Sequence, residues 1–114
     1  MATFKEISGA IRAALDLEVS SDDMEGLTGK LLRLTNLIGS SAELKARAKG
    51  ELKRAELIAY ARYKSEKLTP TMMQTVIGGE CSQEYENLEY ADRLNAGIVH
   101  ACDSIRTIIS LRKE

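Results

Sequence analysis

The chain has 114 residues, which is typical of one domain, and its formal net charge is −1. Aromatic residues make up only 4% and proline occurs once, so Ala, Leu and Ile must fill the interior. This composition favours narrow helix–helix contacts and an all-α fold. No run of 18 apolar residues and no signal-peptide pattern is present, so we expect a cytoplasmic protein without a membrane span. We therefore predict one all-helical domain over residues 1–114. It is a long-helix hairpin or bundle with a short connecting helix, completed by oligomerisation.

The first predicted helix covers residues 3–16. Apolar residues recur at helical spacing from Phe4 to Leu15. Thr3 can cap the start of this helix, with Glu6 three residues later as the second member of a capping box. Because the apolar face is small, this helix needs a partner to cover it.

A second helix is predicted to start near residue 22. Ser20 or Ser21 can supply the N-cap, and the acids that follow favour the positive end of the helix dipole. Apolar residues then step by three and four positions from Met24 to Ile38, which is a heptad pattern. The Gly-Ser-Ser sequence at residues 39–41 either ends this helix or bends it. Residues 22–66 therefore form either two helices or one long bent helix.

The basic segment is residues 41–67, which carry eight of the 16 Lys and Arg residues and only four acids. Helix formers dominate it, and a helical wheel gathers apolar residues from Leu44 to Ala59 on one narrow arc that we expect to be buried. A second arc beside it carries cations and two tyrosines, which suit a phosphate backbone and unstacked bases. An ordinary solvated helix face with charge pairs within the helix is the alternative. The second arc consists of Lys45, Lys49, Lys53, Tyr60, Tyr63, Lys64 and Lys67.

After the basic segment, the sequence predicts a short connecting helix and then a long final helix. Thr69 and Pro70 can start a short helix that stops at Gly78 and Gly79, with its methionines filling the core. From Ser82 a last helix runs to the C-terminus, with a regular apolar stripe that fits packing on more than one neighbour. We expect this stripe to form the oligomer interface, through Ala91, Leu94, Ile98, Ala101, Ile105 and Ile108.

Acidic runs flank the basic segment on both sides. Residues 16–25 and residues 80–92 each carry five acids and no base. We expect these runs to pair with the basic segment, either within one chain or between subunits.

No catalytic or metal-binding pattern is found in the sequence. His100, the only histidine, lies opposite the apolar stripe of its helix, where side chains stacked on one face do not converge into a catalytic pocket. Cys81 and Cys102 lack the spacing of zinc ligands, and Cys102 is expected to be a buried hydrophobic residue. We therefore predict a non-enzymatic protein with no metal and no cofactor.

Three stretches resemble the recombination mediator protein of T4-type phages: ELKARAKGELKRAELIAYARYKSE at 43–66, QTVI at 74–77 and ACDSIRTIIS at 101–110. Together they cover about a third of the chain, and the N-terminal part does not align. The resemblance implies an all-α homo-oligomer in the host cytoplasm that binds single-stranded nucleic acid and has a RecA-like recombinase as partner. It also adds Arg54 and Arg62 to the predicted contacts. The implied contact set is Lys53, Arg54, Tyr60, Arg62, Tyr63 and Lys64.

These observations favour a phage-type accessory protein of recombination or replication that binds single-stranded nucleic acid through its basic helix. The alternative is a non-enzymatic structural or assembly protein, such as a virion component, whose basic helix pairs with acidic protein surfaces. A third class, a bundle that binds a small molecule, requires a pocket that sequence patterns do not reveal.

Overall fold

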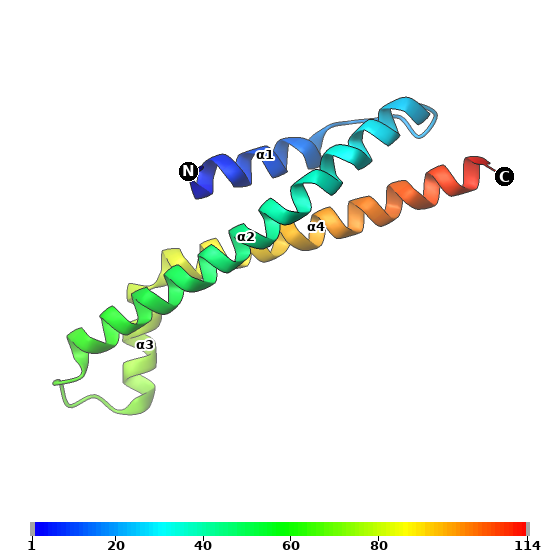
Figure 1. The fold of residues 1–114 in the computed structure, drawn as a ribbon. Helices are drawn as coiled ribbons and strands as arrows, with labels where there is room; N and C mark the ends of the chain where they lie inside the picture. Colours follow the sequence, from blue (N-terminus) through cyan, green and yellow to red (C-terminus); the bar gives the residue numbers. More distant parts are fainter. Residues whose placement is uncertain (1, 114) are drawn as a thin grey trace.

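The computed structural model describes residues 2–113, and within this range the chain is all-helical. It forms α1 (Phe4–Asp16), α2 (Met24–Tyr63), α3 (Pro70–Glu80) and α4 (Ser82–Lys113). The two long helices α2 and α4 run antiparallel, α1 lies along one end of the pair, and α3 lies at the other end (Figure 1). The molecule is an elongated rod of 67 × 29 × 18 Å. The all-α prediction is confirmed.

The helix starts follow from side-chain capping. Thr3 Oγ1 accepts a hydrogen bond from the Glu6 backbone at 3.1 Å, and Thr69 Oγ1 accepts one from Met72 at the same distance. These two predicted caps are therefore confirmed. The predicted serine cap of the second helix is wrong, because Asp23 Oδ1 accepts from the Gly26 backbone at 2.9 Å.

Helix α2 is a single helix of 40 residues, about 60 Å long, that continues through the Gly-Ser-Ser sequence at 39–41. Ser41, which sequence analysis places at a helix boundary, is instead buried in the core. The helix ends at Tyr63, earlier than the wheel over residues 41–67 assumed. The predicted buried arc is confirmed, because Leu44, Ala48, Leu52 and Ala59 are buried and Ala55 is half-buried.

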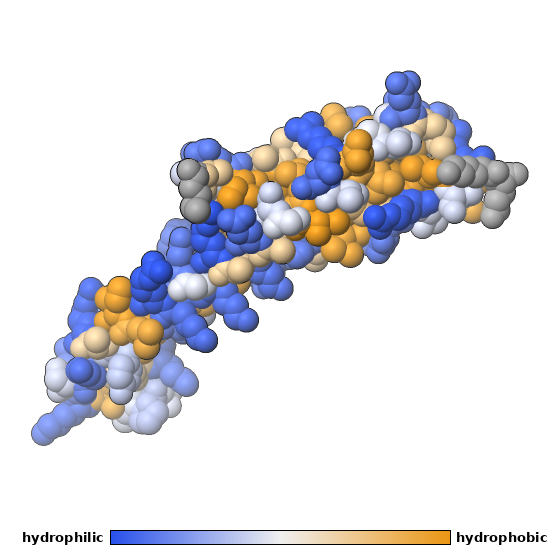
Figure 2. Space-filling model, viewed as in Figure 1, coloured by the Kyte–Doolittle hydropathy of each residue, from blue (hydrophilic) through white to orange (hydrophobic). Residues whose placement is uncertain are grey.

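The main core lies where α1, α2 and α4 run side by side. Ile11 and Ala14 of α1 are fully buried there, and they pack against Leu34 and Leu44 of α2 and against the apolar stripe of α4. Figure 2 shows most of the hydrophobic surface in this part of the molecule. Arg47 holds the start of α1 in place by donating to the Ala2 carbonyl at 2.8 Å.

The residues expected at an oligomer interface are used inside the single chain. Ala91, Leu94, Ile98 and Ile105 are buried in the main core, where α1 and α2 cover them. Ala101 and Ile108 are half-buried against the same core. We expected this apolar stripe to be buried between two copies of the chain. In the structure, α1 and α2 of the same chain bury it. Most of the stripe is therefore covered within one chain, and Ala101 and Ile108 are its only partly accessible members.

A second, smaller core lies at the α3 end of the molecule. Leu52, Ala59 and Cys81 are buried there, and Ile77 of α3 packs against them. No residue of α3 is itself buried, so the prediction that its methionines fill the core is wrong: Met72 is 49% exposed and Met73 is half-buried. Helix α3 runs through Gly78 and Gly79 to Glu80, two residues beyond the predicted stop, because both glycines keep a helical backbone and the Cys81 amide donates to the Ile77 carbonyl.

Between residues 2 and 113, no helix combines the length and the apolar character needed to cross a bilayer. Cys102 is buried, as predicted, and so is Cys81.

Candidate nucleic-acid interface

The basic segment lies on the second half of α2 and on the loop that follows it. One side of this half-helix packs on α4 and α3, and the opposite side faces solvent (Figure 1). Every predicted contact residue is exposed except Tyr63, which is half-buried. Helix α2 ends at Tyr63, and Lys64 follows directly as its C-cap with a helical backbone, so Lys64 keeps its predicted place on the helical wheel. Lys67 lies in the loop after α2 and therefore does not belong to the predicted arc of cations.

Three of the predicted contacts are engaged by acids of the same chain. Lys45 Nζ lies 3.1 Å from Asp92 Oδ1, and Arg62 Nη1 lies 2.6 Å from Glu80 Oε2. The Tyr63 hydroxyl donates to Glu80 Oε1 at 2.8 Å. The predicted pairing with the basic segment is therefore confirmed within one chain for the 80–92 acidic run. For the 16–25 run it is not found among residues 2–113, where Asp16 pairs with Arg12 and Asp22 with Arg112.

The other cations of the set have no ion pair with any residue of the described range. They are Lys49, Lys53, Arg54, Lys64 and Lys67. Tyr60 lies among them with 53% of its surface exposed, and its hydroxyl has no partner among residues 2–113. At 100° per residue, Lys49, Lys53, Tyr60 and Lys64 fall within an arc of about 60°. We call these four residues the open basic face.

The open basic face is suited to a single strand of nucleic acid. From Lys49 to Lys64 the axial rise is about 22 Å, so the cations follow a straight line rather than surround a compact ligand. Ammonium groups in such a row replace the counterions of a phosphate backbone, and an exposed phenol ring offers a surface for one base. Between residues 2 and 113 the lysines of this face have no acidic partner that an incoming anion would have to displace.

Two tyrosines near this face are held by carboxylates. The hydrogen bond to Glu80, then burial, raises the pKa of Tyr63 above its usual value of 10.0. The Tyr85 hydroxyl of α4 donates to Glu56 at 2.7 Å, and this bond, followed by burial, raises the pKa of Tyr85 as well. Both phenols therefore remain neutral donors. The acidic run at residues 80–92 indicated that this part of the chain would contact the basic segment. The individual pairs, Tyr63–Glu80 and Tyr85–Glu56, depend on how α3 and α4 pack against α2.

Sequence analysis missed two exposed aliphatic residues on the basic half of α2. On the helical wheel Leu57 borders the open basic face, about 20° from Lys64, whereas Ile58 lies about 120° from Lys64. Leu57 and Ile58 are 69% and 56% exposed on the outer side of α2. Figure 2 shows a separate hydrophobic group at the α3 end of the molecule, apart from the main core region. Isolated exposed aliphatic residues are common on protein surfaces. Two exposed aliphatic residues on a helix rich in cations favour a protein-binding role as the alternative function of this helix.

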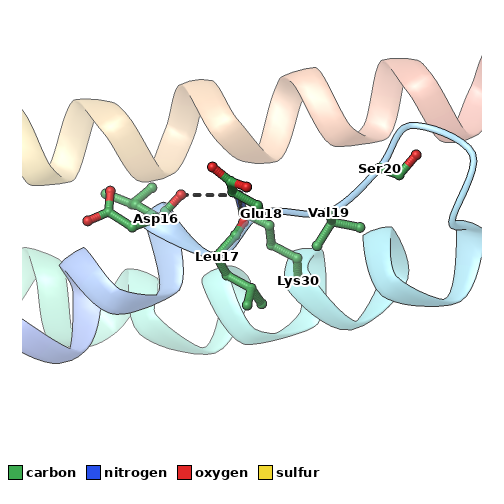
Figure 3. A pocket seen from close by; sticks show the side chains of 7 residues that line it. Asp16, Leu17, Glu18, Val19, Ser20 and Lys30 are labelled. Atoms are coloured by element: carbon green, nitrogen blue, oxygen red, sulfur yellow. Dashed lines mark hydrogen bonds between the residues drawn. The ribbon is translucent and has the colours of Figure 1, made fainter.

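A shallow hollow lies at the opposite end of the rod, under the loop between α1 and α2. Figure 3 shows Lys30 of α2 close to the end of α1 at Asp16 and to the loop that carries Leu17 and Glu18. Its ammonium group donates to the carbonyls of Leu15 and Leu17 at 3.1 and 2.7 Å. This polar group closes the end of α1 and supports the loop, so we assign the hollow a structural role.

The described residues hold no group of three or more His, Cys, Asp or Glu side chains arranged to bind a metal ion. His100 is exposed on α4. Cys81 is buried, and this burial, reinforced by the nearby charge of Glu84, raises the pKa of its thiol. A thiol kept neutral in this way is a poor nucleophile.

The fold and its exposed residues thus define an all-α rod with an open basic face on its longest helix. Comparisons of the chain with protein-family models, with curated proteins and with solved structures found no match.

Proposed function

We propose that this protein binds single-stranded nucleic acid through the open basic face of α2, as a non-enzymatic accessory protein of recombination or replication. The observation that carries the proposal is the row of unpaired cations with an exposed tyrosine between them, on a helix held rigid by packing on its other side. The resemblance to phage recombination mediators supports the biological setting. A phage origin, a homo-oligomeric state, a cytoplasmic location and a recombinase partner belong to the same proposal.

The salt dependence of binding is the first test. If the three lysines of this face each contact a phosphate, log K should fall with log salt concentration with a slope of about −2 for a single strand. Fluorescence anisotropy with a labelled single-stranded oligonucleotide, on protein of measured mass, gives this slope directly. Absence of binding at low salt would overturn the proposal.

A charge-reversal pair then locates the site. Lys49→Glu with Lys53→Glu should abolish binding, because both residues are exposed and unpaired and their replacement puts acids in the middle of the face. Lys5→Glu with Arg33→Glu is the matched control. It makes the same change in net charge at two exposed positions away from the face. Equal losses in both variants would mean that overall charge, rather than this face, causes binding.

The second candidate function is a structural or assembly protein that uses α2 to bind an acidic protein surface. The exposure of Leu57 and Ile58 favours it, because aliphatic side chains contribute little to phosphate recognition but are typical of protein contacts. Under this hypothesis, Leu57→Ser with Ile58→Ser lowers the mass of an assembly and leaves oligonucleotide binding unchanged. Light scattering of the same variants in the absence of nucleic acid separates the two functions.

A further inference from the structure

Glu80 connects the end of α3 to two predicted contact residues at the end of α2. Its Oε2 accepts from Arg62 at 2.6 Å and its Oε1 accepts from the Tyr63 hydroxyl at 2.8 Å. Two neighbouring donors that converge on the two oxygens of one anion can equally hold two oxygens of a phosphate. The Arg62 side chain is 58% exposed and that of Glu80 is 34% exposed, so a dissolved anion can reach this contact.

The element that carries Glu80 is the most weakly held helix of the chain. None of the residues of α3 is buried, whereas α1 and α2 each contribute fully buried residues to the core. Gly78 and Gly79 directly precede Glu80, and a glycine inside a helix destabilises it by about 1 kcal/mol relative to alanine. Segments with few buried contacts open at a lower free energy than the rest of a protein. The end of α3 up to Glu80 can therefore separate from α2 while the main core stays intact and Cys81, the next residue, stays anchored in the second core.

We propose that the Glu80 contact is autoinhibitory: the carboxylate occupies the Arg62–Tyr63 position in place of a phosphate, and the nucleic acid must displace it to use the whole basic face. This inference rests on the proposed function and concerns its regulation. Lys49, Lys53 and Lys64 accept the strand first, because they have no partner to lose. Arg62 and Tyr63 join after the end of α3 moves away.

The test compares Glu80→Gln with Glu66→Gln in the same anisotropy assay. Both variants remove one negative charge, but Glu66 lies in the exposed loop after α2 and forms no ion pair within the described range. Glu80→Gln should bind roughly three- to tenfold more tightly than wild type, since an exposed charged contact no longer competes. Its salt slope should be steeper by about 0.7, the increment for one additional phosphate contact. Glu66→Gln should show only the small gain of the general charge change.

A second pair of variants changes the stability of α3 and leaves the charge unchanged. A Cβ atom at position 79 meets no atom within 4 Å, so Gly79→Ala is tolerated and should hold Glu80 more firmly on α2. It should weaken oligonucleotide binding by up to about fivefold. Gly39→Ala, equally free of contacts but far from the basic face on α2, is the control and should leave binding unchanged.

The outcomes separate the two proposals. If neither wild type nor any variant binds the oligonucleotide at low salt, the proposed function itself is overturned. If all of them bind, with Glu80→Gln equal to Glu66→Gln and Gly79→Ala equal to Gly39→Ala, nucleic-acid binding stands and autoinhibition is overturned. A tighter Glu80→Gln together with a weaker Gly79→Ala supports autoinhibition.

Discussion

Truncation of Tyr60 should weaken binding of a single strand far more than truncation of another exposed tyrosine. Tyr60 is 53% exposed on the open basic face, and its ring is available for one base. Loss of one base–aromatic stack costs roughly 1–3 kcal/mol, which corresponds to a decrease in affinity of about 5- to 150-fold. Tyr60 belongs to neither core, so Tyr60→Ala should change the stability of the fold little.

Anisotropy titrations of Tyr60→Ala and Tyr85→Ala at one fixed salt concentration make the comparison. Tyr85 is 40% exposed on α4, outside the basic face, and its hydroxyl is bound to Glu56. We expect Tyr85→Ala to bind as wild type does. The salt slope of Tyr60→Ala should also stay at the wild-type value, because no cation is lost. Unchanged affinity in Tyr60→Ala would show that the ring does not stack on a base, and the interface would then be purely electrostatic.

Three further predictions concern the fold. Leu94→Asp with Ile98→Asp should unfold the single chain rather than only separate copies, because both side chains are buried between α1, α2 and α4; a soluble variant with wild-type circular dichroism would contradict this. Ser41→Ala should raise the free energy of unfolding in urea by about 1 kcal/mol, because the buried hydroxyl has no hydrogen-bond partner among the described residues; a decrease would show that it has one. Burial raises the pKa of Cys81 above its usual 9.0, so the native state keeps this proton where the unfolded chain loses it. Stability should therefore fall as pH rises through 9, and less so in Cys81→Ala; parallel pH profiles of the two proteins would refute this.

The parts of the fold that depend on local chemistry were predictable from the sequence. The Thr3 and Thr69 caps depend on a hydroxyl placed three residues before an unpaired backbone amide, and both are present. The buried arc of α2 follows from helical periodicity alone. Because the same periodicity determines which residues face solvent, it also placed Lys49, Lys53 and Tyr60 at the surface.

The continuity of α2 was not predictable from local signals. Gly39 and Ser41 favour a helix boundary by propensity, but Ser41 packs into the core in phase with Leu34 and Leu44. Tertiary contacts along a continuous stripe outweigh propensity differences of about 1 kcal/mol. The same stripe on α4 was assigned to an oligomer because its periodicity cannot distinguish a helix of the same chain from a helix of another copy.

Sequence patterns also could not predict which cations of the basic segment form ion pairs and which do not. The pairs Arg62–Glu80 and Lys45–Asp92 join residues 18 and 47 positions apart, so they exist only because α3 and α4 return along α2. The sequence indicates that acids near 80–92 compensate the basic helix, but it does not indicate which cations they occupy.

This division matters more for binding than the number of cations does. A lysine without a partner gives up only solvent ions when a phosphate arrives, whereas Arg62 must also release Glu80, and Lys45 must release Asp92. The cations without an ion pair in the described range therefore gain more from a bound strand than Lys45 and Arg62 do. Under the proposed function, a strand first contacts Lys49, Lys53 and Lys64, and it reaches Arg62 and Tyr63 only after the end of α3 moves away. The stability of a short helix that need not touch the ligand then changes the affinity.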